Sequence, residues 1–143
     1  MSVNVKKTLA FCLYRYFPHG GLQRDMLRIA LACQRRGYAI AVYTTTWEGA
    51  PPDEFKLHTY HPTGFTNHGR MRQFHAWLTV KRVHQEAACV VGFNKMPNLD
   101  VYFAGDSCFA QRARRRNPLV RLTGRYRTYA ALEAAVFSPG SPT

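Results

Sequence analysis

The chain has 143 residues, with 20 Lys or Arg against 8 Asp or Glu, so its formal net charge is +12. A hydrophobic content of 46% is that of a folded protein and excludes a disordered chain. The length suits a single core, and the charge predicts an anionic partner: a phosphosugar, an acidic lipid surface or a nucleic acid. No stretch approaches the roughly 20 apolar residues that span a bilayer, so we expect a soluble or peripheral protein.

The first predicted elements form a strand, a glycine turn and a helix. Residues 9–13 are an apolar run typical of a buried strand, Gly20 and Gly21 follow, and residues 21–36 carry apolar side chains at helical spacing. Paired glycines let a ligand approach the backbone, and the free N–H groups of the first helical turn favour an anion. Such a pair also ends many strands for steric reasons alone, so both interpretations stay open.

The middle of the chain continues the alternation of strands and helices. Gly37 is expected to end the first helix in a left-handed conformation. Strands are predicted at 39–43, 55–60, 89–93 and 101–104, and Asn67 is expected to cap a second helix. Because strands and helices alternate, the sequence predicts a doubly wound α/β fold with a mainly parallel sheet.

From residue 109 to 137 the chain becomes strongly basic. Arginines crowd this region together with apolar and aromatic residues, which predicts a basic amphipathic helical region. The residues expected to contact an anionic membrane are Arg112, Arg114, Arg115, Arg116, Arg121, Arg125, Arg127 and Tyr126. The alternative is a solvated arginine face on a helix packed against the sheet. Residues 138–143 are linker-like.

Several polar residues follow predicted strands or open predicted helices. Asp106 follows the last apolar strand, where doubly wound sheets bind ligands, although an aspartate there can equally cap a helix. Asn67, His68 and Arg70 offer hydrogen-bond donors within one turn, or form a cap with polar surface neighbours. Lys95 follows a strand at the same expected edge and can bind an anion.

Metal and nucleotide-cofactor signatures are missing from the sequence. The chain has no G-x-G-x-x-G fingerprint and no Asp-x-Asp triplet, so we assign no cofactor and no metal. Its four cysteines are widely spaced, without a C-x-x-C pair, which favours free thiols in a reducing, cytosolic compartment over a disulfide framework.

Longer stretches of the sequence carry a family resemblance. Residues 11–25, Phe-Cys-Leu-Tyr-Arg-Tyr-Phe-Pro-His-Gly-Gly-Leu-Gln-Arg-Asp, resemble the start of the lipopolysaccharide core glucosyltransferases that add the first glucose to heptose. These are retaining enzymes of glycosyltransferase family 4 with two Rossmann-like domains, the GT-B fold. The segments 66–70, 91–97, 99–104 and 121–127 fit the same family.

The resemblance implies a domain organisation. Residues 1–137 are expected to form the Rossmann-like, acceptor-side N-terminal domain, in which 109–137 is the basic membrane-facing region and 138–143 a linker-like tail. Family members are more than twice as long, and their C-terminal donor-binding domain has no counterpart in this chain.

The resemblance also implies an activity and a set of site residues. The activity is transfer of glucose from UDP-glucose to heptose of the heptosylated lipid A acceptor, on the cytoplasmic face of the inner membrane. Asp106 is expected to be catalytic, Gly20, Gly21 and Asp25 to lie near the donor, and Asn67, His68, Arg70 and Lys95 to bind the acceptor. Because the main donor site lies in the other domain, we expect the chain alone to be inactive.

Two other functions are compatible with the composition. The first is a non-catalytic, basic domain that binds the membrane surface, and turnover of UDP-glucose with and without the other domain separates it from the transferase. The second is nucleic-acid binding, which the charge allows, although no RNA- or DNA-binding motif is present. A salt-sensitive affinity for heparin and RNA alike would mark such binding as nonspecific.

Overall fold

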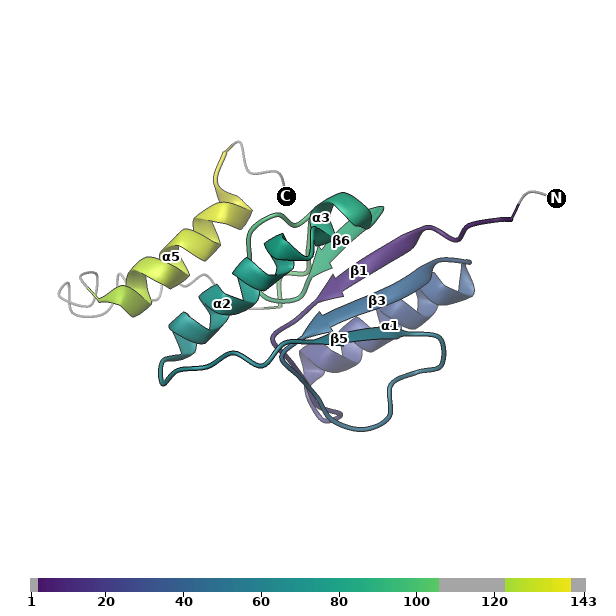
Figure 1. Ribbon diagram of the computed structural model, residues 1–143, viewed down its shortest axis with the longest axis horizontal. Helices are drawn as coiled ribbons and strands as arrows, with labels where there is room; N and C mark the ends of the chain where they lie inside the picture. The colour runs from purple at the N-terminus through teal and green to yellow at the C-terminus, as the bar shows by residue number, and fades with distance from the viewer. Residues whose placement is uncertain (1–2, 106–122, 140–143) are drawn as a thin grey trace.

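A computed structural model describes residues 3–105 and 123–139 of the chain (Figure 1). Its centre is a five-stranded, entirely parallel sheet in the order β5-β3-β1-β6-β7. These strands are β1 (Thr8–Cys12), β3 (Ala39–Thr44), β5 (Lys56–Thr59), β6 (Cys89–Gly92) and β7 (Val101–Tyr102).

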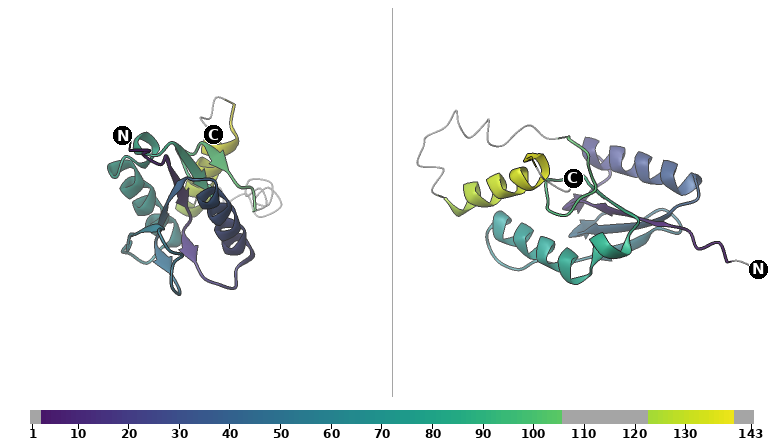
Figure 2. Two further views of the ribbon diagram at one scale, coloured as in Figure 1. Left: turned by 90° about the vertical axis from the view of Figure 1, so that its right-hand side faces the viewer. Right: turned by 90° about the horizontal axis from the view of Figure 1, so that it is seen from above.

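Helices cover both faces of the sheet, as Figure 2 shows from above. Helix α1 (Gly21–Arg35) lies on one face, while α2 (Asn67–Val80) and the short α3 (Val83–Glu86) lie on the other. Helix α5 (Gly124–Phe137) runs beside α2 on the same side. Within the described residues no helix is long and apolar enough to cross a membrane.

The alternation of side chains along β1 divides the core between the two faces. Phe11 and Leu13 are fully buried against the α1 side, together with Met26. Ala10 and Cys12 point to the other side, where they pack with residues of α2 such as Phe74. A central strand of a parallel sheet is covered on both faces, which explains why β1 is largely apolar along its length.

The direction of strand progression reverses beside β1. From β1 the chain moves outward through β3 to β5, then returns to place β6 on the opposite side of β1. In doubly wound sheets ligands bind beyond the carboxyl ends of the strands at such a reversal. Beyond these ends lies a second, two-stranded sheet, in which β2 (Arg15–Tyr16) pairs with β4 (Thr46–Trp47).

The fold class predicted from the sequence is confirmed, with local differences. Gly37 has a φ of +93°, the left-handed conformation expected after α1. The predicted cap of α2 is wrong, because Thr66 is the N-cap and Asn67 the first helical residue. The Thr66 hydroxyl accepts a hydrogen bond from the Gly69 N–H at 3.3 Å. The β2–β4 pair and α3 are too short to leave a periodic signal.

Candidate functional site

A cavity of about 300 Å³ opens at the carboxyl edge of the sheet. Its wall comes from the β1–α1 connection, the start of α1, the loops after β3 and β5, the start of α2 and the loop after β6. The lining residues are Tyr14, Arg15, Phe17, Gln23, Thr45, Pro62, Asn67, Arg70, Met71 and Asn94. It therefore lies where the fold predicts a ligand site, and its volume is within the range of small-molecule pockets.

Tyr14 connects several segments that surround the cavity through hydrogen bonds. Its N–H donates to Asn94 Oδ1 at 2.9 Å and its carbonyl accepts from the Thr44 hydroxyl at 3.2 Å. Its phenol lies 2.7 Å from His75 Nε2 and donates to the Lys95 carbonyl at 3.1 Å. Because the hydroxyl has a single proton, these contacts are satisfied together when His75 carries its proton on Nε2.

Burial keeps both members of the Tyr14–His75 pair neutral. Desolvation raises the pKa of the Tyr14 phenol well above its ordinary value, with a smaller contribution from the charge of Tyr129. Desolvation also lowers the pKa of His75 to about 4. A neutral pair suits a structural role beside the cavity better than proton transfer near pH 7.

The glycine turn lies beside the cavity and its two glycines differ. A Cβ on Gly20 would come within 1.8 Å of Gln23 Oε1 and 2.8 Å of Phe17 Cε2, both on residues that line the cavity. Gln23 is held in place by donating from Nε2 to the Arg15 carbonyl at 3.0 Å. A Cβ on Gly21 would meet none of the described residues within 4 Å. The absence of a Cβ at Gly20 therefore lets Gln23 and Phe17 pack against it, whereas Gly21 borders open space.

The predicted acceptor residues are only partly brought together. Asn67 and Arg70, from the first turn of α2, line the cavity. His68 does not line it and instead lies near the start of α5, since a Cβ on Gly124 would be 3.6 Å from its Nε2. Asp25, predicted near the donor, lies in the second turn of α1 and is also not part of the lining.

Lys95 is engaged in an ion pair. Its Nζ lies 2.9 Å from Glu133 Oε2, and the two side chains are 11% and 8% exposed. This contact joins the loop after β6 to α5. Acceptor binding by Lys95 stays a prediction, and an acceptor anion would have to share the ammonium with Glu133.

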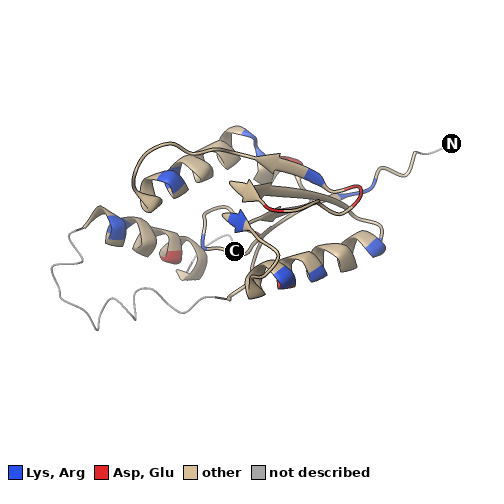
Figure 3. Ribbon diagram, turned by 90° about the horizontal axis from the view of Figure 1, so that it is seen from below, with Lys and Arg blue, Asp and Glu red and all other residues tan. Residues whose placement is uncertain are grey.

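Several predicted residues lie outside the described part of the chain. They are Asp106, Arg112, Arg114, Arg115, Arg116 and Arg121. Arg125 and Arg127 are exposed in the first turn of α5, and Tyr126 between them is half-buried. Figure 3 shows that basic residues occur on α1, α2 and α5 alike.

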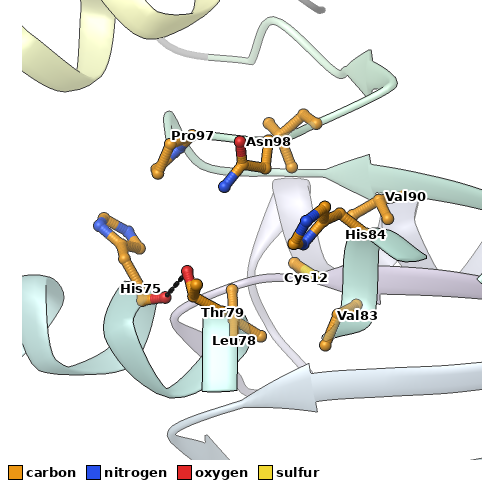
Figure 4. A pocket seen from close by; sticks show the side chains of 10 residues that line it. Cys12, His75, Leu78, Thr79, Val83, His84, Val90, Pro97 and Asn98 are labelled. Atoms are coloured by element: carbon orange, nitrogen blue, oxygen red, sulfur yellow. Dashed lines mark hydrogen bonds between the residues drawn. The ribbon is translucent and has the colours of Figure 1, made fainter. Parts of the chain in front are cut away.

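A second, smaller cavity of about 20 Å³ lies between α2, α3 and the loop before β7 (Figure 4). His75, His84, Thr79 and Asn98 contribute to its lining. This space is sufficient for about one water molecule and is too small for a sugar. Among the described residues no group of three or more His, Cys, Asp or Glu side chains could hold a metal ion.

The sequence prediction missed several residues of the larger cavity. Arg15 and Asn94 were not among the predicted site residues, yet both line it. The sequence did contain a signal for Asn94. Asn94 directly follows Phe93, the last residue of an apolar run, and the residue after such a strand falls at the carboxyl edge of the sheet.

The parallel sheet, the helices on both faces and the cavity at its carboxyl edge define a Rossmann-like domain. Over 136 residues the chain is 51% identical to the lipopolysaccharide glucosyltransferase WaaG of Escherichia coli strain K12. The matched part is 94% of this chain and 36% of WaaG. The family resemblance seen in the sequence is confirmed: the chain is a close homologue of part of a lipopolysaccharide glucosyltransferase.

A solved structure gives the same result. The crystal structure of WaaG, a glycosyltransferase involved in lipopolysaccharide biosynthesis, superposes with a TM-score of 0.90 at 50% sequence identity. The superposition covers 94% of this chain and 37% of that one, so the chain spans little more than a third of the relatives it matches. No family model matches the sequence.

Proposed function

We propose that this chain is the N-terminal, acceptor-side domain of a retaining glucosyltransferase that transfers glucose from UDP-glucose to heptose of the lipopolysaccharide inner core. The observation that carries the proposal is one cavity, at the reversal point of the sheet, that adjoins the Gly20–Gly21 turn and is lined by Asn67 and Arg70. The homology to WaaG supplies the class of reaction.

The chemistry assigned to the chain follows from the positions of its groups. Gly21 borders open space at the N-terminus of α1, where the free N–H groups and the helix dipole favour the departing diphosphate. Asp106 is proposed to accept a hydrogen bond from the donor glucose or to stabilise positive charge in its ring, and Asp25 to support the donor loop. Asn67, His68, Arg70 and Lys95 are proposed to orient the acceptor.

A complete transferase site needs residues from a second domain as well as from this one. In GT-B enzymes the nucleotide is held mainly by the other domain, and this chain matches little more than a third of WaaG. Residues 1–137 are accordingly proposed as the acceptor-side domain. Alone, the chain is expected to lack transferase activity, because it can hold the acceptor and only one side of the donor.

We place the domain at the cytoplasmic face of the inner membrane, attached through residues 109–137. Within the described residues, the start of α5 supports this membrane attachment. Arg125 and Arg127 are exposed there, and the Arg125 guanidinium lies 5.7 Å from the centre of the Tyr129 ring. Arginines beside aromatic rings suit an anionic headgroup layer. A lipid-linked acceptor embedded in the membrane would then lie close to this domain.

The two glycines offer a matched test in a chimaera in which this chain replaces the homologous segment of E. coli WaaG. Gly21→Ala adds a methyl group to open space in a helical turn, so the free energy of unfolding should stay equal or rise by up to about 1 kcal/mol. If that space receives the donor, glucose transfer should fall about 100-fold, because a small misplacement of reacting groups is costly.

Gly20→Ala is the comparison, because the new methyl group must displace Gln23 and should lower stability. Transfer by the chimaera and its urea denaturation are measured for both variants. Full activity of the Gly21→Ala chimaera would contradict the placement of the donor at this turn.

A further inference from the structure

Two arginines line the cavity without an acidic partner among the described residues. Arg15 reaches the cavity from β2 and Arg70 from α2. Within the described part of the chain neither guanidinium forms an ion pair or a side-chain hydrogen bond, and no carboxylate is among the lining residues. Two arginines that line one cavity, with no acid among the described lining residues, favour an occupant that carries an oxyanion.

Asn94 contributes a donor whose orientation is fixed. The Tyr14 N–H donates to its Oδ1 at 2.9 Å, and only the oxygen of the amide can accept that bond. The amide nitrogen, Nδ2, is therefore left to donate elsewhere, on a residue that lines the cavity. Such a donor suits a sugar hydroxyl. Because Tyr14 is in turn held by Thr44, His75 and Lys95, this geometry exists before any ligand binds.

The rest of the cavity limits the size and character of the occupant. Its volume of about 300 Å³ is at the lower end for ligand pockets, which suits a single sugar ring better than an oligosaccharide. Phe17, Pro62 and Met71 add apolar surface to the lining, and the C–H faces of a sugar ring can pack on such side chains. A ring with apolar faces, hydroxyl groups and one negative charge matches all three kinds of lining.

We propose that the cavity is a subsite for one acidic sugar residue, whose oxyanion is bound by Arg15 and Arg70 and whose hydroxyl accepts from Asn94 Nδ2. This assignment deepens the proposed function and depends on it for the identity of the acceptor, but the binding itself does not require transfer. The oxyanion can be a carboxylate or a phosphate, since both pair with guanidinium groups.

The test is a titration of the full 143-residue chain, followed by NMR, with three probes: glucuronate, glucose 6-phosphate and uncharged glucose. We expect at least one acidic sugar to bind with a Kd about tenfold or more below that of glucose, a difference of about 1.4 kcal/mol. Whichever acidic sugar binds more tightly identifies the oxyanion. Shifted resonances should include the Asn94 side-chain amide.

Variants distinguish binding at this subsite from nonspecific attraction of anions to the positively charged chain. Arg15→Gln and Arg70→Gln should each weaken the acidic sugar about tenfold while leaving glucose unchanged, and Asn94→Ala should weaken both. Arg72→Gln is the matched control, because Arg72 is an exposed arginine on α2 that does not line the cavity. Equal binding of charged and uncharged sugars, or an equal loss with Arg72→Gln, overturns the proposal.

The result is independent of the transferase assay. If acidic sugars bind as expected but the WaaG chimaera does not transfer glucose, the proposed function fails and the subsite stands. If the chimaera transfers glucose and the acidic probes bind no better than glucose, the subsite assignment fails and the proposed function stands.

Discussion

Replacing Glu133 with Ala should lower the free energy of unfolding by about 3 kcal/mol or more, because it breaks an ion pair that is shielded from water. The pair joins Lys95, in the loop after β6, to α5 at 2.9 Å, with both side chains at most 11% exposed. Helix α5 packs on the domain through Leu132 and Val136, which are also buried. Urea denaturation of the wild type and the variant at pH 7 measures the loss.

A double variant tests whether the cost arises from the broken pair. Lys95→Met with Glu133→Leu removes both charges and keeps apolar volume, so it should recover most of the stability lost by Glu133→Ala. Glu54→Ala is the control, because Glu54 lies 3.8 Å from Lys6 in an exposed pair and its loss should cost little. A loss no larger for Glu133→Ala than for Glu54→Ala would contradict the structural role of the buried pair.

Acidification should destabilise the domain through His75. Burial lowers the pKa of His75 to about 4 in the folded state, whereas an unfolded chain has the ordinary value of about 6.5. Between these values the unfolded state binds more protons, so the stabilising contribution is complete above about pH 6.5 and decreases as the pH falls toward 4. At pH 4.5 the loss from this group alone should be about 2.5 kcal/mol.

His75→Gln provides the comparison, since an amide N–H can donate to the Tyr14 hydroxyl as Nε2 does and carries no titratable proton. Urea denaturation at pH 7 and pH 4.5 gives the difference for each protein. The wild type should lose about 2 to 3 kcal/mol more than the variant, because the carboxylates titrate in both. Equal losses would show that His75 is not kept neutral by burial.

The sheet could be predicted because its strands are short apolar runs separated by clear breaks. Residues 9–13 and 39–43 read as buried strands, and both match central strands of the structure. The end of α1 was equally predictable, since Gly37 adopts the left-handed conformation that glycine favours. These signals are local, so a single sequence contains them.

The site could be predicted only in part, because its contacts join residues far apart in the chain. Tyr14 and His75 are 61 positions apart, and Lys95 and Glu133 are 38 apart. No local pattern shows that the Lys95 ammonium meets a carboxylate instead of an open edge. Asn67 and Arg70 line the cavity because they lie in the first turn of the helix that starts at that edge, whereas His68 lies near the start of α5.

The most direct test of the central claim is glucose transfer by the chimaera in which this chain replaces the homologous segment of E. coli WaaG. Transfer from UDP-glucose to heptosylated lipid A is measured against intact WaaG and against this chain alone. We predict that the chimaera transfers glucose at a rate within about tenfold of WaaG, and that the chain alone shows no transfer. A chimaera that folds and binds UDP-glucose but transfers no glucose would contradict the claim that this domain supplies the acceptor side of a glucosyltransferase.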